Sequence, residues 1–113
     1  MYIINIETGM PTVEEARERL KAALLKAKKE NKKLVKLIHG YGSTGKGGRL
    51  KTELRKSLVH RRKEGLVRTI IWGEYFSKDK VETQSLLKRH PSLRSDKDLD
   101  RRNEGVTVVE LGS

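Results

Sequence analysis

The segment 37–50, with the sequence LIHGYGSTGKGGRL, most constrains the fold, because an apolar run ends in it and a glycine-rich loop leads directly into a basic stretch. Glycine reaches positive φ without Cβ strain, so successive backbone N–H groups can converge on one oxygen-rich group. A helix after the loop adds its unpaired N–H groups and the positive end of its dipole. The segment therefore predicts an anion site, with phosphate as the expected ligand. The predicted binding residues are Gly40, Tyr41, Gly42, Ser43, Thr44, Gly45, Lys46, Gly47 and Arg49, followed on the helix by Arg55 and Lys56.

Positive charge is concentrated in the same part of the chain. The formal net charge is +11, and residues 39–68 carry nine basic and two acidic side chains, which is +7 of that total. Such a field attracts polyanions, nucleic acid first among them. The alternative is that these lysines and arginines only solvate the outer face of a helix. Because the charge maximum coincides with the glycine loop, we favour nucleic acid as the partner.

Composition excludes several classes of site. The chain has no cysteine, which excludes a disulfide, a thiolate nucleophile and a zinc site with cysteine ligands. The three histidines, at positions 39, 60 and 90, lack the spacing of a metal site. No apolar stretch reaches the roughly 18 residues that span a bilayer, and residues 1–7, MYIINIE, show neither the basic region nor the cleavage site that a signal peptide would have. We therefore expect one domain over residues 1–113, located in the cytoplasm and not in a membrane.

The first 40 residues predict a strand, a helix and a second strand. Alternation of apolar residues indicates a strand over 2–6. Thr12 and Glu15 have the spacing of a capping box, which predicts a helix that begins at Thr12. The short apolar run 34–38 is typical of a buried strand. Two strands joined by a helix imply parallel pairing, which places the glycine loop at the carboxyl end of the second strand.

The rest of the chain predicts one more helix and two more strands, with a polar segment between the strands. The helix is expected to begin near Gly48 and to end at Gly65, and the strands to cover 66–72 and 106–111. Residues 77–104 are polar and nearly balanced in charge, which indicates an insertion before the last strand. Within it, the spacing of Asp79 and Glu82 predicts a short capped helix that ends at Pro91.

Three enzymatic interpretations of these motifs fail on particular residues. The loop resembles a Walker A motif, but Gly47 stands where a serine or threonine holds Mg²⁺. A hydrolase triad would have to use Ser43 or Thr44 beside His39, and nearness in sequence does not establish its geometry. A two-metal nuclease needs several carboxylates, and Glu7 and Glu74 at strand ends are too few to support one.

Three segments together resemble the Smr (small MutS-related) domain family. The run 38–45, IHGYGSTG, is similar to the family's His-Gly-x-Gly signature. Residues 12–16, TVEEA, resemble the start of its first helix, and 106–111, VTVVEL, its closing strand. The resemblance implies a two-layer βαβαββ sandwich with a four-stranded mixed sheet, similar to the C-terminal domain of bacterial translation initiation factor three. It also implies nucleic-acid binding and, in several members, endonuclease activity on DNA or RNA.

The chain departs from the family's first-strand motif, Leu-Asp-x-His. Asn5 stands in place of the aspartate and Glu7 in place of the histidine. The Asn5 amide cannot exchange a proton at neutral pH, so binding without cleavage is the leading expectation and needs no cofactor. One alternative is an endonuclease that uses Mg²⁺ or Mn²⁺, with His39 and Glu7 as catalytic residues. Another is an adaptor that docks on the ribosome or an acidic protein through the same basic surface.

Overall fold

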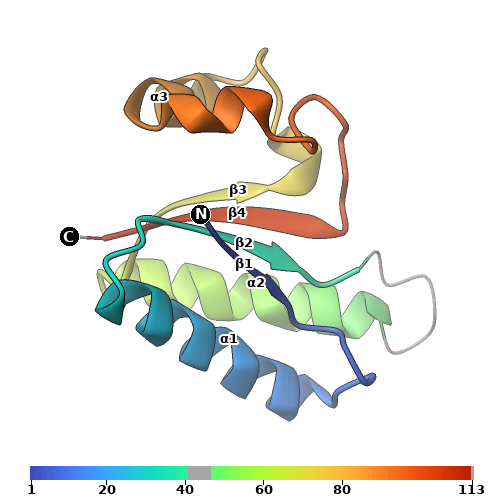
Figure 1. Ribbon diagram of the computed structural model, residues 1–113. Helices are drawn as coiled ribbons and strands as arrows, with labels where there is room; N and C mark the ends of the chain where they lie inside the picture. Colours follow the sequence, from blue (N-terminus) through green and yellow to red (C-terminus); the bar gives the residue numbers. More distant parts are fainter. Residues whose placement is uncertain (41–46, 113) are drawn as a thin grey trace.

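The computed structural model describes residues 1–40 and 47–112 and contains four strands and three helices in these ranges (Figure 1). Two short 3-10 helices, η1 and η2, flank α3 in the chain. The elements in chain order are β1 (Tyr2–Asn5), α1 (Val13–Lys29), β2 (Leu34–Ile38), α2 (Gly47–Lys63), β3 (Val67–Trp72), η1 (Gly73–Tyr75), α3 (Val81–Arg89), η2 (Pro91–Ser95) and β4 (Val106–Leu111).

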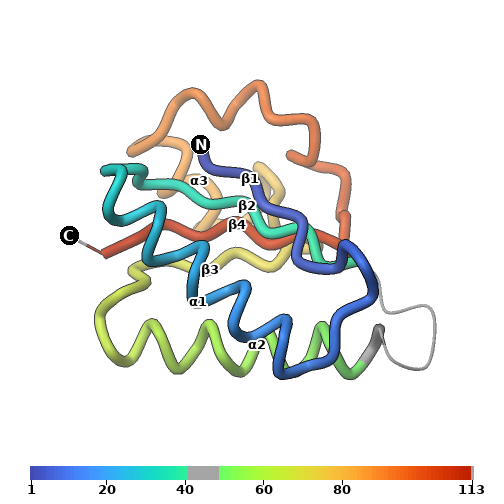
Figure 2. Tube along the Cα trace, turned by 60° about the horizontal axis from the view of Figure 1, so that its bottom comes forward, coloured from blue at the N-terminus to red at the C-terminus, as the bar shows by residue number. Residues whose placement is uncertain are grey.

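The strands form one mixed sheet in the order β1-β2-β4-β3 (Figure 2). β1 and β2 are parallel, which confirms the pairing predicted from the first 40 residues. β4 lies between β2 and β3 and is antiparallel to both. It follows that the carboxyl ends of β1, β2 and β3 all lie at the same end of the sheet. The glycine loop follows β2 at that end.

Local sequence accounts for both ends of α1. Thr12 is the N-cap: its side chain accepts a hydrogen bond from the Glu15 N–H, while Glu15 accepts one from the Thr12 N–H, as predicted. At the other end Asn31 has φ 58°, and the N–H of Lys32 donates to the carbonyl of Ala27. This is a Schellman ending with asparagine in the left-handed position. α2 ends in the same way, with Gly65 at φ 86°.

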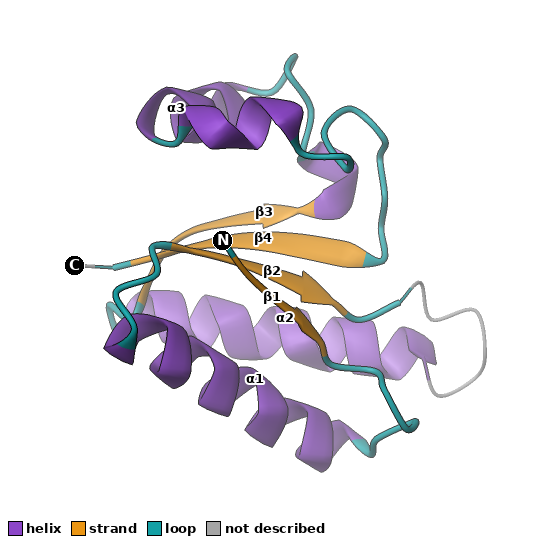
Figure 3. Ribbon diagram, viewed as in Figure 1, coloured by secondary structure: helices purple, strands orange, loops and turns teal. Residues whose placement is uncertain are grey.

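Helices cover both faces of the sheet (Figure 3). α1 and α2 lie on one face, which gives the two layers that were predicted, and α3 covers the other face as a third layer that was not. Each face has its own apolar core, because side chains along a strand alternate between the two. The core under α1 and α2 includes Leu20, Leu24, Val35, Leu37, Leu54, Leu58, Ile70 and Val109, and the core under α3 includes Leu34, Ile71, Phe76, Leu86, Leu93 and Val108.

The segment between η1 and β4 forms α3 and η2, and the predicted capping box at the start of α3 is wrong. The N-cap is Lys80, and no side chain caps this end. Asp79 instead accepts a hydrogen bond from the Ser77 hydroxyl, so its carboxylate serves the preceding turn and not the helix. The helix ends at Arg89, and Pro91 begins η2. Within residues 1–40 and 47–112, no helix combines the length and apolar character that crossing a membrane requires.

Candidate nucleic-acid interface

The predicted site lies at the sheet edge where β1, β2 and β3 end and where α2 begins (Figure 1). β2 leads into His39 and Gly40, and β3 leads into Glu74 on η1. The Glu7 carboxylate comes from the turn after β1 and reaches Gly40. The topology therefore gathers residues that are far apart in the sequence at one end of the molecule.

His39 is buried, with only 2% of its surface exposed, and both of its ring nitrogens have partners. Nδ1 lies 3.0 Å from the carbonyl oxygen of Gly40, and Nε2 lies 2.9 Å from the Thr107 hydroxyl on β4. A carbonyl oxygen only accepts, so Nδ1 carries the proton, and Nε2 accepts the hydrogen bond of the hydroxyl. The backbone N–H of His39 donates to the carbonyl of Gly105. These bonds fasten the end of β2 to the start of β4.

The surroundings of His39 keep its imidazole neutral. Burial lowers the pKa of His39 below its ordinary value, and the hydrogen bond to Gly40 opposes this effect only in part. The positive charges of Arg55 and Lys51 lower the pKa further, while Glu74 raises it slightly. At neutral pH the ring is therefore uncharged, and its Nε2 lone pair is already used by Thr107.

Gly40 has φ 77°, as the prediction of a positive-φ glycine at the loop required. A Cβ at this position would collide with the Glu7 carboxylate, so the residue also has to be small. Its N–H donates to the carbonyl of Gly105 at 3.1 Å. This N–H is therefore already used within the protein, and the predicted part of Gly40 in anion binding stays a prediction.

Arg55 is held by the protein itself and is not free. Its Nη2 donates to both carboxylate oxygens of Glu74, at 2.6 and 2.9 Å, and its guanidinium stacks over the Trp72 ring at 4.6 Å from the centroid. Burial raises the pKa of Glu74, but the hydrogen bond and charge of Arg55 outweigh burial and leave it below its ordinary value. Glu74 is therefore held by Arg55 and is not a freely solvated acid.

The other cations of α2 differ in how far they are neutralised. Arg49 is exposed and has no ion pair within the described ranges. Lys51 lies 3.6 Å from Glu104, and Lys56 lies 3.5 Å from Glu53, which also pairs with Arg17. No acidic residue occurs in the first turn of α2. Arg49 is therefore the predicted contact that is best placed to bind an external anion.

The remaining loop predictions fall on Tyr41, Gly42, Ser43, Thr44, Gly45 and Lys46, which lie outside the described residues. Gly47 is described and begins α2. In the described part of the chain, no group of three or more histidine, aspartate or glutamate side chains could hold a metal ion. Glu7 and His39, the predicted catalytic pair, come together through Gly40 without forming such a group.

Comparison with known proteins supports the same family as the motifs do. The family model of the Smr domain matches residues 8–71, which is more than half of the chain. The chain belongs to the Smr domain family. The fold is similar to the crystal structure of the Smr domain of Thermus thermophilus MutS2, with a TM-score of 0.60, 21% sequence identity and 100% of both chains covered. A search of curated proteins found no match.

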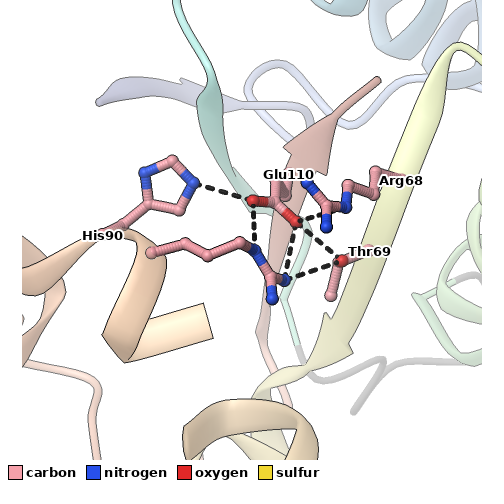
Figure 4. Close-up of polar contacts among 5 residues, drawn as sticks. Arg68, Thr69, His90 and Glu110 are labelled. Atoms are coloured by element: carbon pink, nitrogen blue, oxygen red, sulfur yellow. Dashed lines mark hydrogen bonds and ion pairs between the residues drawn. The ribbon is translucent and has the colours of Figure 1, made fainter. Parts of the chain in front are cut away.

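This Smr domain also contains a polar cluster at the opposite end of the sheet, around Glu110 (Figure 4). Glu110 is 3% exposed and accepts hydrogen bonds from Thr69, His90 and Arg89, all between 2.8 and 2.9 Å. Burial raises the pKa of Glu110, but these donors outweigh burial and lower it from 4.5 to about 2. The cluster ties α3 to β3 and β4.

Sequence reasoning missed Thr107 and Gly105 as partners of His39, and it missed the pairing of Arg55 with Glu74. Thr107 lies in the predicted strand 106–111 and Gly105 directly before it, and nothing in that segment indicates a contact with the histidine. A signal did exist for the third. Glu74 lies two residues after Trp72, which ends β3, and a carboxylate close to a strand end needs a cation if it is to be partly buried.

Proposed function

We propose that this Smr domain binds nucleic acid by gripping phosphates with its glycine-rich loop and the following helix, α2. The observation that carries the proposal is the exposed Arg49 in the first turn of α2, which has no ion pair with any described residue and lies in a turn without acidic residues. A helix N-terminus favours anions through its free N–H groups and its dipole. A guanidinium in the same turn adds a full charge and a fork of donors that fits phosphate oxygens.

The other cations of α2 differ in how readily they can contact a phosphate. Lys56 has a side chain that is 70% exposed, and its ion pair with Glu53 is long and at the surface, where such pairs are weak. A phosphate can displace such a pair. Arg55 contributes differently: it is bound to Glu74 and Trp72, so it positions the wall of the site while its charge is offset.

Single strands and structured RNA fit the proposal better than duplex DNA. Sequence-specific readers of the major groove present a helix whose side chains reach base edges. The polar face of α2 consists mainly of lysine and arginine, which suit phosphate contacts. We infer that binding is governed by the backbone charge of the nucleic acid and has little sequence preference.

A salt series tests the proposal directly. Affinity for a single-stranded RNA is measured across salt concentrations for the natural chain and for the variant Lys46→Ala/Arg49→Ala. Each lost phosphate contact flattens the slope of log affinity against log salt by about 0.7. We expect a flattening of about 1.4, together with weaker binding to every sequence tested.

A matched variant controls for net charge. Lys21→Ala/Lys29→Ala removes two exposed cations from α1, far along the chain from the loop, and should leave the slope unchanged. Equal loss in both variants would show that only overall charge matters and would refute the site. Strong preference for ribosomes over naked RNA in the same assay would instead support the adaptor alternative.

Endonuclease activity is the second candidate, because the Glu7 carboxylate and His39 both lie against Gly40. For His39 to act as a base, however, Nε2 would have to give up the Thr107 hydroxyl. Labelled RNA and plasmid DNA are incubated with the purified chain in Mg²⁺, in Mn²⁺ and in chelator. Metal-dependent cleavage that disappears in both Glu7→Gln and His39→Gln supports this candidate. Cleavage that survives both substitutions points to a contaminating nuclease.

A further inference from the structure

A groove of about 440 Å³ lies beside β3, and we propose that it stacks an unpaired base of a single-stranded nucleic acid. The proposal rests on the proposed function and adds a second contact to it. The volume of the groove is within the range of about 300–1,000 Å³ that is usual for small-ligand sites, a class that includes sites for a mononucleotide. The lining residues that carry the argument are Arg62, Trp72, Tyr75, Lys80 and Val81.

Tyr75 supplies an aromatic surface that is already in place. Its residue surface is 52% exposed, although the neighbouring Phe76 is fully buried. The carbonyl of Tyr75 accepts hydrogen bonds from the Thr83 hydroxyl at 2.8 Å and from the Ser77 N–H at 2.9 Å. A half-exposed ring on a backbone fixed by a buried neighbour and two hydrogen bonds loses little entropy when it binds a flat partner.

One cation lies over this ring and a second lines the same groove. The Lys80 ammonium lies 5.8 Å from the centroid of Tyr75, and Lys80 and Arg62 are exposed without an ion pair in the described ranges. Glu82 is the single acidic residue in the lining, so the groove has a net positive charge. Aromatic rings between cations are the usual arrangement for binding single strands, because bases stack on the rings while the cations contact phosphates.

The groove begins at the end of the sheet where β2 leads into the glycine loop. β2 and β3 are both antiparallel to β4, so Gly40 and η1 leave the sheet at the same end. Trp72 joins the two regions, since it lines the groove and also carries the Arg55 guanidinium of α2 on its ring. A strand held by phosphates at the loop can therefore continue along β3 and place a base on Tyr75.

A peptide is the rival occupant. β3 is an edge strand, and in the described ranges its backbone pairs only with β4, so an extended acidic peptide could add to its free edge. That mode would use the backbone and would not need an aromatic ring. The exposed Tyr75 with Lys80 above it favours the nucleic acid.

The test compares an oligonucleotide that carries bases with an abasic oligonucleotide of the same length and charge. Trp72 is the one tryptophan in the sequence, so its fluorescence reports on this groove. We expect the base-carrying strand to change Trp72 fluorescence and the abasic strand not to change it. Tyr75→Ala should weaken binding of the base-carrying strand about five- to hundredfold, and leave the affinity for the abasic strand within about twofold.

Two variants control this result. Tyr75→Phe keeps the ring and should retain most of the affinity. Tyr2→Ala removes another tyrosine with a lysine above its ring, Lys26 at 5.7 Å, from the far edge strand, and should leave binding unchanged. Equal weakening of both strands by Tyr75→Ala, or no response of Trp72 to bases, overturns the proposal. An acidic peptide that displaces the oligonucleotide from the groove and binds Tyr75→Ala normally also overturns it. If neither strand binds with a salt dependence, the proposed function itself fails.

Discussion

Lys36 in the middle of β2 and Asp98 after η2 form an ion pair of 2.6 Å in which both side chains are buried. A second carboxylate, that of Asp96, lies 2.6 Å from the same ammonium. Asn103 also donates to Asp98, at 3.0 Å. Burial raises the pKa of Asp98, but the hydrogen bonds from Lys36 and Asn103 outweigh burial and lower it. The pair therefore fastens the segment between η2 and β4 to the face of the sheet under α3.

Removing Lys36 should destabilise the protein strongly. Lys36→Met leaves two buried carboxylates without a cation, and breaking a buried pair in this way costs about 3–5 kcal/mol. The triple variant Lys36→Met/Asp96→Asn/Asp98→Asn removes every charge of the cluster and should recover most of that loss. Urea denaturation followed by circular dichroism measures each free energy of unfolding. A triple variant as unstable as Lys36→Met would contradict this account.

Much of the fold could be predicted because it depends on local patterns. The capping box at Thr12, the apolar run of β2 and the positive φ of Gly65 each rest on residues close together in the sequence, and all three are present. The parallel pairing of β1 and β2 followed from the helix between them. These features were predictable because each is determined within one or two elements.

The third layer and the polar partners could not be predicted, because they depend on contacts between distant segments. Lys36 gave a signal, since a lysine in a buried apolar strand requires a partner, but the sequence alone does not say which aspartate provides it. Likewise, β4 was predicted as a strand, but its sequence does not indicate that Thr107 and Glu110 on it bind His39 and Arg89. The predicted loop residues from Tyr41 to Lys46 stay predictions.

The second prediction concerns acid stability and Glu110. Its pKa is about 2 in the folded protein and near 4.5 when unfolded, so its contribution is fully present above pH 4.5 and is lost as pH falls toward 2. A shift of this size corresponds to about 3 kcal/mol. Glu110→Gln should lower the free energy of unfolding at pH 7 by a similar amount. In this variant the free energy of unfolding should also fall less steeply as the pH is lowered from 4.5 to 2. Glu18→Gln, an exposed site on α1, should change neither quantity. If the free energy of unfolding of Glu110→Gln depends on pH below 4.5 as that of the natural chain does, the lowered pKa of Glu110 does not account for acid stability.

The third prediction separates backbone strain from steric clash at Gly40. Gly40 and Gly9 have similar positive φ, 77° and 80°, but only at Gly40 would a Cβ meet another group, the Glu7 carboxylate. Gly9→Ala should therefore cost about 1 kcal/mol from strain alone. Gly40→Ala should cost more, up to about 3 kcal/mol. Adding Glu7→Ala to Gly40→Ala should recover the difference between the stability costs of Gly40→Ala and Gly9→Ala. Thermal unfolding measures all three variants, and no recovery in the double variant would show that Glu7 does not limit this position.

The fourth prediction distinguishes Arg55 from Arg49 on α2. Arg55 is paired with Glu74 and stacked on Trp72, so Arg55→Ala should lower the free energy of unfolding by about 1–3 kcal/mol and leave the salt slope of RNA binding nearly unchanged. Arg49→Ala should do the reverse, with little loss of stability and a slope flatter by about 0.7. Melting curves and a salt series on both variants make the comparison. A flatter slope in Arg55→Ala than in Arg49→Ala would show that nucleic acid displaces Glu74.

The last prediction concerns the tautomer of His39. Because Nδ1 faces the Gly40 carbonyl and Nε2 faces the Thr107 hydroxyl, ¹⁵N NMR should find the proton on Nδ1 and a pKa below 6.5. Unfolded chains take up a proton near pH 6.5 and the folded chain does so only at lower pH, so stability should fall as pH drops below 6.5. His60, with a side chain that is 67% exposed, is the internal reference for the NMR shifts. Thr107→Val leaves Nε2 without a donor and should cost about 1–3 kcal/mol. If the proton is found on Nε2, the lone pair of Nδ1 faces the Gly40 carbonyl oxygen. That result would mean that the hydrogen bonds assigned to this ring are wrong.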